Sequence, residues 1–249
     1  MDLGIDGRVA LVTGASKGIG LGIARALAAE RVQVAITSRS RERIDAAAAE
    51  ADAHGFVHDS QDLDGVPGLL QEVESALGPL DILVTNTGGP PPGPDPLGFS
   101  REQWESAYRD LMLSPMAFIE AAMPGMRERG FGRVLGVFSS AVREPIGTLM
   151  LSNTHRSGLL AGFKTIARAV AADGVTVNAV LPGKILTDRL IAGQGSREAA
   201  IESARGDVPM GRPGTVEEFG AVVAFLASAP ASYVTGTALL VDGGLTHGI

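Results

Sequence analysis

The sequence predicts an α/β fold in which a doubly wound, parallel sheet of about seven strands carries helices on both faces. Three observations lead to this prediction. Short runs rich in Val, Ile and Leu are apolar at nearly every position, which is typical of strands covered on both faces. Longer segments with helical spacing of apolar residues separate these runs. The two kinds of segment alternate along the chain, which indicates βαβ units with right-handed crossovers.

The elements can be assigned in order along the chain. The expected strands are Arg8–Gly14, Val32–Ser38, a weaker one at Phe56–His58, Leu80–Asn86, Arg133–Ser140, Val175–Gly183 and Ala238–Gly244. The expected helices are Ile19–Arg31, Arg41–Ala53, Leu63–Leu77, Ser100–Arg129, Leu149–Asp173 and Val216–Ser228. Neither a linker nor an internal repeat divides the chain, so residues 1–249 are expected to form one domain. In such a Rossmann-type sheet, ligands bind outside the carboxyl ends of the strands.

Composition excludes several classes of function. The formal net charge is −7, whereas a nucleic-acid surface needs a basic field to attract phosphates. The absence of cysteine excludes disulfides and thiolate metal sites, and it fits a reducing compartment. No apolar run approaches the roughly 18 residues that a membrane span needs, and acidic residues precede the first apolar run, unlike in a secretory signal. We therefore expect a cytoplasmic protein with no metal site, no nucleic-acid partner and no membrane association.

A glycine-rich loop lies between the first expected strand and the first expected helix. It reads TGASKGIG, with the spacing G-x-x-x-G-x-G. Gly14 is expected to allow the sharp turn, Gly18 to let the backbone approach a pyrophosphate, and Gly20 to permit close contact between helix and strand. The helix N-terminus adds free N–H groups and the positive end of the helix dipole. The residues expected to contact a dinucleotide here are Gly14, Ser16, Lys17, Gly18, Ile19 and Gly20.

Further motifs, taken with this loop, resemble those of the short-chain dehydrogenase/reductase family. The chain is similar to the 3-oxoacyl-acyl-carrier-protein reductases of that family over nearly its whole length. HDSQD matches the segment whose acidic residue meets the adenine, VTNTGG replaces the usual N-N-A-G, VNAVLPGKILTDRL matches the P-G-x-x-x-T segment along the nicotinamide, and YVTGTALLVDGG matches the closing strand. The resemblance implies further cofactor contacts at Asp59, Asn86, Gly88, Arg156, Pro182, Gly183, Ile185 and Thr187.

The end of the second expected strand selects between the two nicotinamide cofactors. An aspartate there would bind the ribose 2′-hydroxyl of NAD, whereas a nearby arginine accepts the 2′-phosphate of NADP. The sequence reads Ser38-Arg39-Ser40-Arg41 without a carboxylate, and Lys17 adds positive charge from the glycine loop. Alternatively, the two arginines merely begin a solvated helix. Because two separate positions agree, the sequence predicts NADP(H) in preference to NAD(H), with Ser38 and Arg39 beside the phosphate.

The resemblance also locates the family's catalytic positions, and here the chain departs from the pattern. Family members have a serine at the end of the fifth strand, a tyrosine thirteen residues on, a lysine four beyond, and an asparagine on the preceding long helix. Only the serine is matched, by Ser139, while the other positions hold Ser152, Arg156 and Leu111. The lysine lowers the pKa of the tyrosine so that it can donate a proton near neutrality. The usual mechanism therefore does not carry over to this chain.

The replacements still form a polar set. Ser152 and Arg156 are four residues apart and share one helix face. Arg156 is expected to bind the nicotinamide ribose and to stabilise an oxyanion, but not to shuttle protons, because guanidinium stays protonated. His155 titrates in a useful range and is a candidate proton donor, with a surface or capping role as the alternative. Tyr108 and Lys184 are weaker candidates. The sequence thus assigns catalysis to Ser139, Ser152, His155 and Arg156.

Two functions remain open on the sequence alone. The first is an oxidoreductase that transfers a hydride between NADP(H) and an unidentified small carbonyl or alcohol, with non-standard proton delivery. The second is a catalytically silent NADP(H)-binding protein that acts as a sensor or assembly partner. The proline-rich loop Thr87–Phe99 either shapes the substrate site or braces a crossover, and residues 186–213 match the family's mobile substrate lid. By the same resemblance, a homo-oligomer, either a tetramer or a dimer, is expected.

Overall fold

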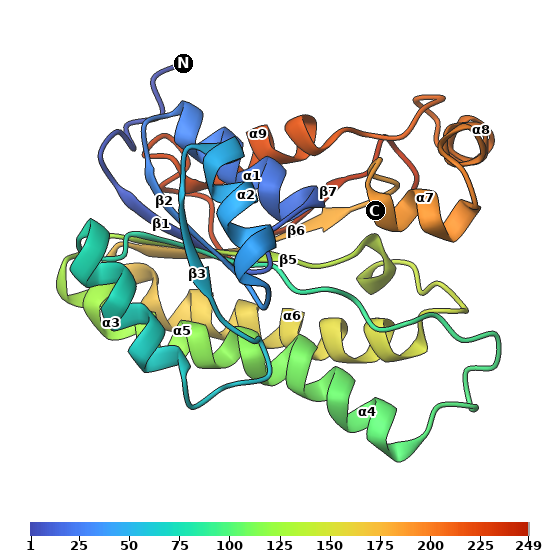
Figure 1. Cartoon of the computed structure of the whole chain (residues 1–249), viewed down its shortest axis with the longest axis horizontal. Coiled ribbons are helices and arrows are strands. Elements are labelled where there is room, and N and C mark those ends of the chain that lie inside the picture. The colour runs from blue at the N-terminus through green and yellow to red at the C-terminus, as the bar shows by residue number, and fades with distance from the viewer. Residues whose placement is uncertain (249) are drawn as a thin grey trace.

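A single parallel sheet forms the centre of the molecule (Figure 1). The computed structural model describes residues 1–248, and its seven strands lie in the order β3-β2-β1-β4-β5-β6-β7. The strands are β1 (Val9–Val12), β2 (Gln33–Ser38), β3 (His54–Val57), β4 (Ile82–Thr85), β5 (Gly132–Val137), β6 (Val175–Pro182) and β7 (Ala238–Val241). The winding reverses between β1 and β4, so the predicted doubly wound fold is confirmed.

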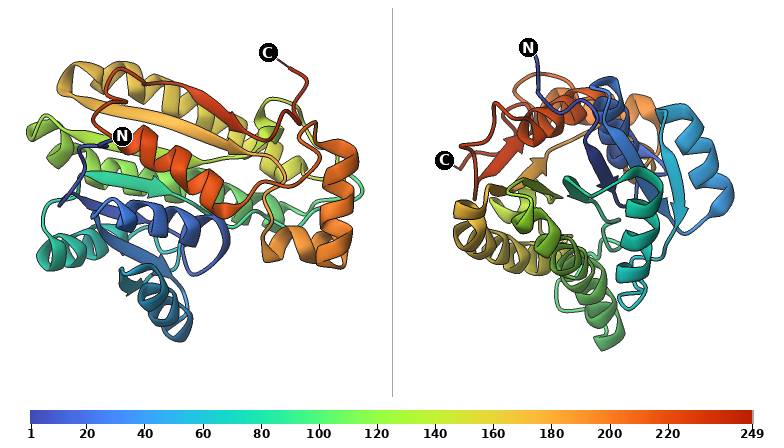
Figure 2. Two further views of the ribbon diagram at one scale, coloured as in Figure 1. Left: turned by 90° about the horizontal axis from the view of Figure 1, so that it is seen from above. Right: turned by 90° about the vertical axis from the view of Figure 1, so that its left-hand side faces the viewer.

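Helices cover both faces of this sheet (Figure 2). They are α1 (Gly18–Ala29), α2 (Arg41–Ala51), α3 (Val66–Leu77), α4 (Arg101–Tyr108), α5 (Ser114–Glu128), α6 (Met150–Val170), α7 (Asp188–Gln194), α8 (Arg197–Asp207) and α9 (Val216–Ala227). Side chains of α1, α2 and α9 pack on one face, and those of α3, α5 and α6 pack on the other. Every residue of β1 and β4 is buried between these layers, which explains the continuous apolar runs in the sequence.

The long helix expected at Ser100–Arg129 is interrupted in the structure. It begins with a capping box between Ser100 and Gln103, and a π-helical segment, η1 (Arg109–Leu113), separates α4 from α5. Leu111 lies within this segment and is buried. A π turn inserts one extra residue into the helical repeat, so it changes the direction of the side chains that follow. The predicted helical segment is present from Arg101 to Glu128, and its π-helical centre was not predicted.

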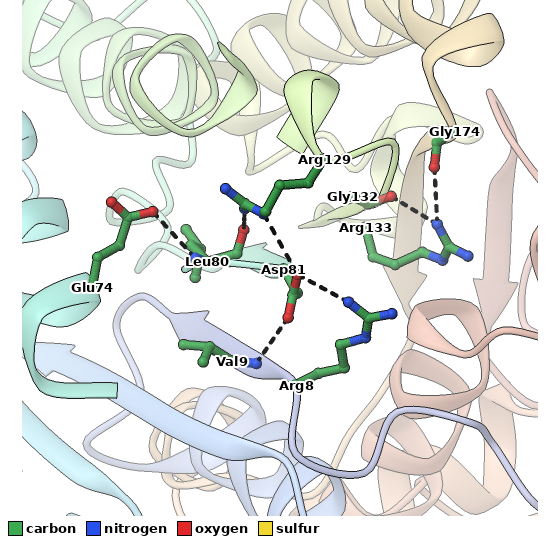
Figure 3. Close-up of polar contacts among 9 residues, drawn as sticks. All are labelled: Arg8, Val9, Glu74, Leu80, Asp81, Arg129, Gly132, Arg133 and Gly174. Carbon is green, nitrogen blue, oxygen red and sulfur yellow. Dashed lines mark hydrogen bonds and ion pairs between the residues drawn. The ribbon is translucent and has the colours of Figure 1, made fainter. Parts of the chain in front are cut away.

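Charged groups cluster at the amino ends of β1, β4 and β5 (Figure 3). Asp81 accepts hydrogen bonds from Nη1 of Arg8 at 3.3 Å and from the backbone N–H of Val9 at 3.4 Å, and Nε of Arg129 lies 4.0 Å away. The guanidinium of Arg133 donates to three backbone carbonyls and lies 4.3 Å from the ring centroid of Phe131. This cluster stabilises the amino-end edge of the sheet. Ligands bind in this fold at the opposite edge, outside the carboxyl ends of the strands.

The segment between β6 and α9 extends beyond the carboxyl ends of the strands (Figure 1). It contains α7 and α8 and corresponds to the expected lid at residues 186–213. Its two ends meet in a bridge between Ile185 and Gly214, where the N–H of Leu186 donates to the Gly214 carbonyl at 2.9 Å. The segment therefore leaves and rejoins the domain at one point. Across residues 1–248, no helix has the length and apolar character needed to cross a membrane.

Candidate active site

The glycine loop forms a tight turn after β1 that is tied to the end of β4. Gly14 has a φ of 59°, and a Cβ atom there would lie 2.5 Å from the carbonyl oxygen of Asn86. A Cβ on Gly20 would lie 2.7 Å from both the Gly14 carbonyl oxygen and Nδ2 of Asn86. The Asn86 amide itself donates to the carbonyls of Thr13 and Gly14, at 3.2 and 2.9 Å. Only glycine fits at positions 14 and 20, so the backbone conformation here depends on both.

The N-terminus of α1 has no side-chain cap, which fits an anionic ligand. Lys17 occupies the cap position and makes no capping hydrogen bond. A Ser or Thr side chain caps α2, α4, α7, α8 and α9, whereas α3, α5 and α6, like α1, begin without one. The first N–H groups of a helix need partners, and a phosphate at an uncapped N-terminus would supply them together with a favourable dipole interaction. The residues present therefore suit the pyrophosphate of a dinucleotide.

The other residues expected to contact the cofactor lie on several elements. Thr187 packs over the glycine loop, since a Cβ on Gly18 would lie 3.5 Å from its Cγ2 atom. Ile185 is buried, Pro182 ends β6, and Gly183 follows it. Asp59 is exposed after β3, where it accepts a hydrogen bond from the N–H of Gln61 at 3.0 Å. The half-buried Ser16 and Ile19 lie in the glycine loop and at the start of α1, and the exposed Gly88 follows β4.

The positive charges expected near a 2′-phosphate differ in their partners. Arg41 pairs with Asp45 at 3.5 Å within α2, and Lys17 pairs with Asp188 of α7 at 3.6 Å. Arg39 is exposed and has no carboxylate within ion-pair distance among residues 1–248. Ser38 fixes the strand end through hydrogen bonds between its hydroxyl and the backbone of Ser40, at 3.2 and 3.3 Å. Of these cations, Arg39 is thus the one available to a phosphate.

Ser139, Ser152 and Arg156 come from two neighbouring elements. Ser139 lies two residues after the end of β5 and caps the short helix η2 (Ser140–Val142), where its Oγ accepts a hydrogen bond from the N–H of Ala141 at 3.2 Å. Arg156 reaches from α6 to the carbonyl of Val137, with Nη1 at 2.7 Å. Ser152 is buried one turn earlier on α6. The helix face that carries Ser152 and Arg156 therefore faces the carboxyl end of β5, beside Ser139.

Arg156 is a buried cation with a small set of partners. Its side chain is 7% exposed, and it donates to the carbonyls of Val137 and Thr87, the latter at 3.4 Å. Burial, with a smaller contribution from the positive charge of Arg189, lowers the pKa of the Arg156 guanidinium to about 10. The group therefore stays charged at neutral pH. Two of its five N–H donors are used, so the others can bind a ligand oxygen.

His155 points to a different place from its neighbours on α6. Its ring makes an edge contact with Trp104, at 5.5 Å between centroids, and a tilted contact with Tyr108 at 5.8 Å, so it packs against α4. Burial lowers the pKa of the imidazole below its ordinary value, although a hydrogen bond with the Trp104 backbone opposes this. A neutral imidazole among aromatic rings is a poor proton donor. This geometry favours a packing role for His155 over proton delivery.

The other candidate proton donors also lie elsewhere. The ammonium of Lys184 donates to Ser203 Oγ at 2.8 Å and forms an ion pair with Asp207, which ties it to α8. Tyr108, the last residue of α4, contacts His155 of α6. Tyr233, which precedes β7, is completely exposed. Neither tyrosine occupies the place of Ser152. No group of three or more potential metal-ligating side chains was found within residues 1–248.

The loop after β4 contacts elements on both sides of it, and one of these contacts involves a residue that the sequence did not single out. The N–H of Gly93 donates to the Thr148 carbonyl at 2.9 Å, next to the start of α6. Arg189 of α7 donates to the carbonyls of Gly89 and Pro90, at 2.9 and 3.1 Å. Arg189 lies near the end of the recognised motif VNAVLPGKILTDRL, but no periodicity or spacing connects it to a loop about 100 positions away.

Comparison with known proteins establishes the family. A family model described as enoyl-(acyl carrier protein) reductase matches residues 14–246. The chain is 33% identical over 247 residues to the 3-oxoacyl-[acyl-carrier-protein] reductase FabG of Escherichia coli, covering 98% of this chain and 99% of that protein. The chain belongs to the short-chain dehydrogenase/reductase family. The predicted resemblance and the predicted class of enzyme, a short-chain oxidoreductase, are confirmed.

Solved structures of short-chain reductases superimpose closely on this fold. L-sorbose reductase from Gluconobacter frateurii, in complex with NADPH and L-sorbose, matches with a TM-score of 0.94 and 30% identity over the whole of both chains. YwfH, an NADPH-dependent reductase involved in bacilysin biosynthesis, matches with a TM-score of 0.90 and 30% identity over 97% of this chain and 99% of that one.

Proposed function

We propose that this short-chain dehydrogenase/reductase transfers a hydride between NADP(H) and a small carbonyl or alcohol substrate, with proton delivery that does not use a tyrosine. The buried, charged guanidinium of Arg156, hydrogen-bonded to the Val137 carbonyl at the carboxyl end of β5, is the observation that carries the proposal. The close fit to an L-sorbose reductase crystallised with NADPH supports both the cofactor and the substrate class.

The side chains have separate roles in this proposal. The nicotinamide, when bound, supplies or accepts the hydride. Arg156 donates hydrogen bonds to the nicotinamide ribose and to the substrate oxygen that becomes negative, because fixed donors in a buried site stabilise developing charge strongly. Ser139 and Ser152 orient the carbonyl through their hydroxyls. An aliphatic hydroxyl is about as weak an acid as water, so neither serine replaces the tyrosine as a dedicated acid. The alkoxide takes its proton from solvent water, directly or through a serine hydroxyl, and hydroxide is released to the solvent.

The cofactor would lie across the carboxyl ends of β1, β2 and β4. Its pyrophosphate would contact the uncapped N-terminus of α1 at Ser16, Gly18 and Ile19. Thr187 would cover it from the lid, and Asp59 would lie at the adenine end. Asn86 holds the glycine loop in shape rather than facing the ligand with its amide, since that amide already donates to two carbonyls.

The preference for NADP(H) over NAD(H) rests on Arg39 in this proposal. We expect Arg39→Ala to lower the ratio of kcat/KM for NADPH to that for NADH by about 10- to 100-fold, the value of one or two charge-assisted hydrogen bonds. Arg41→Ala is the matched control, because Arg41 already pairs with Asp45. Steady-state kinetics with both cofactors measure the ratio. An equal decrease in this ratio in Arg39→Ala and Arg41→Ala would show that the total charge of the segment, and not Arg39, sets the preference for NADPH.

Oxidation of NADPH over a panel of ketones and aldehydes tests the proposed reaction. Ser139→Ala is expected to reduce kcat about 10- to 100-fold, because one hydrogen-bond donor to the reacting oxygen is lost. His155→Gln is expected to leave kcat within about threefold, since the ring packs on α4. Turnover that is insensitive to Ser139→Ala would refute the site assignment.

A second function, a silent NADP(H)-binding protein, is favoured by one specific observation. Three of the four family catalytic positions hold Ser152, Arg156 and Leu111, and Leu111 is buried without a polar atom to hold water. This protein would bind NADPH tightly in a fluorescence titration and oxidise it with no member of the panel. That result would replace the first proposal with the second.

A further inference from the structure

Two arginines from different elements reach the same short segment, Thr87–Pro90. Arg156 of α6 donates to the Thr87 carbonyl at 3.4 Å. Arg189 of α7 donates to the carbonyls of Gly89 and Pro90, and a Cβ on Gly89 would lie only 2.8 Å from its Nη2 atom. The two positive charges are close enough for Arg189 to lower the pKa of Arg156. Two like charges are thus held side by side at the carboxyl end of β4.

Neither guanidinium has a carboxylate partner among residues 1–248, although acidic side chains outnumber basic ones in this chain. Of the sixteen other arginines, eight have one: Arg8, Arg25, Arg31, Arg41, Arg127, Arg129, Arg205 and Arg212. Buried Arg133 lacks a carboxylate as well, but three carbonyls and the face of Phe131 compensate its charge. The pair at Arg156 and Arg189 has no such ring. Arg189 is exposed, whereas Arg156 is buried, and a buried cation without a counter-charge is costly. The second cation beside it adds to this cost, which points to an anion supplied by a ligand.

The pyrophosphate of the cofactor is not the natural partner for Arg189. That group is matched by the N-terminus of α1, and the lid contributes Asp188 on that side, paired with Lys17 at 3.6 Å. The next residue, Arg189, extends to the loop after β4 instead. There it binds the same short segment that Arg156 contacts through the Thr87 carbonyl. Three of its five donors remain available, enough for a bidentate contact.

We propose that the substrate is a carboxylate, such as an oxo acid, whose anionic end binds between Arg189 and Arg156 while its carbonyl lies at Ser139 and Ser152. The position of the carbonyl in this proposal rests on the proposed function. The anion site does not, because it is argued from Arg189 and Arg156 alone. Arg189 would be a specificity-determining residue on the lid, so binding of the acid would also draw the lid towards the loop after β4.

Matched pairs of acid and ester test the proposal in the full-length protein saturated with NADPH. The probes are 2-oxohexanoate and 4-oxohexanoate, each compared with its methyl ester, which keeps the ketone and removes the charge. We expect kcat/KM for the better acid to exceed that of its ester by about 10- to 100-fold, the range for a charge-assisted bidentate contact. Arg189→Gln is expected to abolish this preference while the Kd for NADPH changes less than about threefold. Arg197→Gln, which removes an equal charge from the lid, is the control and should retain the preference.

A second readout separates this proposal from the proposed reaction. Calorimetric titration of the NADPH complex with each acid and ester measures binding without turnover. One outcome combines three results: the acid binds more tightly than the ester, Arg189→Gln removes this difference in affinity, and no ketone is reduced. The anion site would then stand and the proposed reaction would fail. If acids and esters bind and react equally, the anion site is wrong and the oxidoreductase stands. A variant that loses only NADPH affinity would assign Arg189 to the pyrophosphate and overturn the proposal.

Discussion

Arg156→Met is expected to lower kcat/KM for NADPH-dependent reduction by about 100-fold or more, the largest loss of any single change in this site. The substitution removes a preorganised charge from a buried position beside Ser139, and losing one such donor typically costs a factor of about 100 to 1,000. Methionine has a similar length and keeps the packing of α6. Steady-state rates with the most reactive carbonyl measure the effect.

Stability distinguishes a functional loss from a folding defect in this variant. The carbonyls of Val137 and Thr87 lose their donors, but an uncompensated buried charge is removed at the same time. We expect the free energy of unfolding in urea to change by less than about 2 kcal/mol. Arg156→Lys keeps the positive charge but has fewer hydrogen-bond donors. Its kcat/KM should lie between that of the parent protein and that of Arg156→Met. A fully active methionine variant would show that the guanidinium is structural.

Installing the family's own pair, Ser152→Tyr with Arg156→Lys, is expected to raise kcat about 100-fold over the parent. A tyrosine whose pKa is lowered by a neighbouring ammonium delivers a proton far better than serine or water, and general acid catalysis contributes factors of about 100 to 10,000. The gain requires that α6 present this face to the substrate, which the contact between Arg156 and Val137 indicates. The pH profile of kcat should also acquire the titration of the new phenol.

The matched control for this gain is Ser152→Phe with Arg156→Lys. It introduces the same ring without the hydroxyl, so any effect of bulk at the buried position 152 appears in both variants. We expect the phenylalanine variant to be no faster than the parent. Equal rates for the tyrosine and phenylalanine variants would mean that proton delivery does not limit this chain.

Much of the fold could be predicted because parallel strands are buried on both faces. That burial gives β1 and β4 continuous apolar runs that stand out in the sequence. The π segment at Arg109–Leu113 could not be predicted, since its composition is that of an ordinary helix and its register depends on packing against α6. The glycine loop was recognisable because its backbone needs residues without a Cβ at Gly14 and Gly20.

The site could be predicted where it depends on helix periodicity and not where it depends on distant partners. Ser152 and Arg156, one turn apart, do share a face. His155 lies about 100° around the helix from Arg156 but only about 60° from Ser152, so periodicity alone could not decide which way it points. The contact of Lys184 with Asp207 and that of Arg189 with Gly89 join residues far apart in the chain. Such contacts depend on the three-dimensional path of the lid, which no local pattern encodes.

A crystal structure of the NADPH complex tests the central claim most directly, because it shows which side chains surround the reactive carbon of the nicotinamide. We predict a nicotinamide ring bordered by Ser139 and Ser152, with the guanidinium of Arg156 donating to the adjoining ribose and the 2′-phosphate beside Arg39. A ring that binds elsewhere, or a ribose contacted by none of these side chains, would contradict the account.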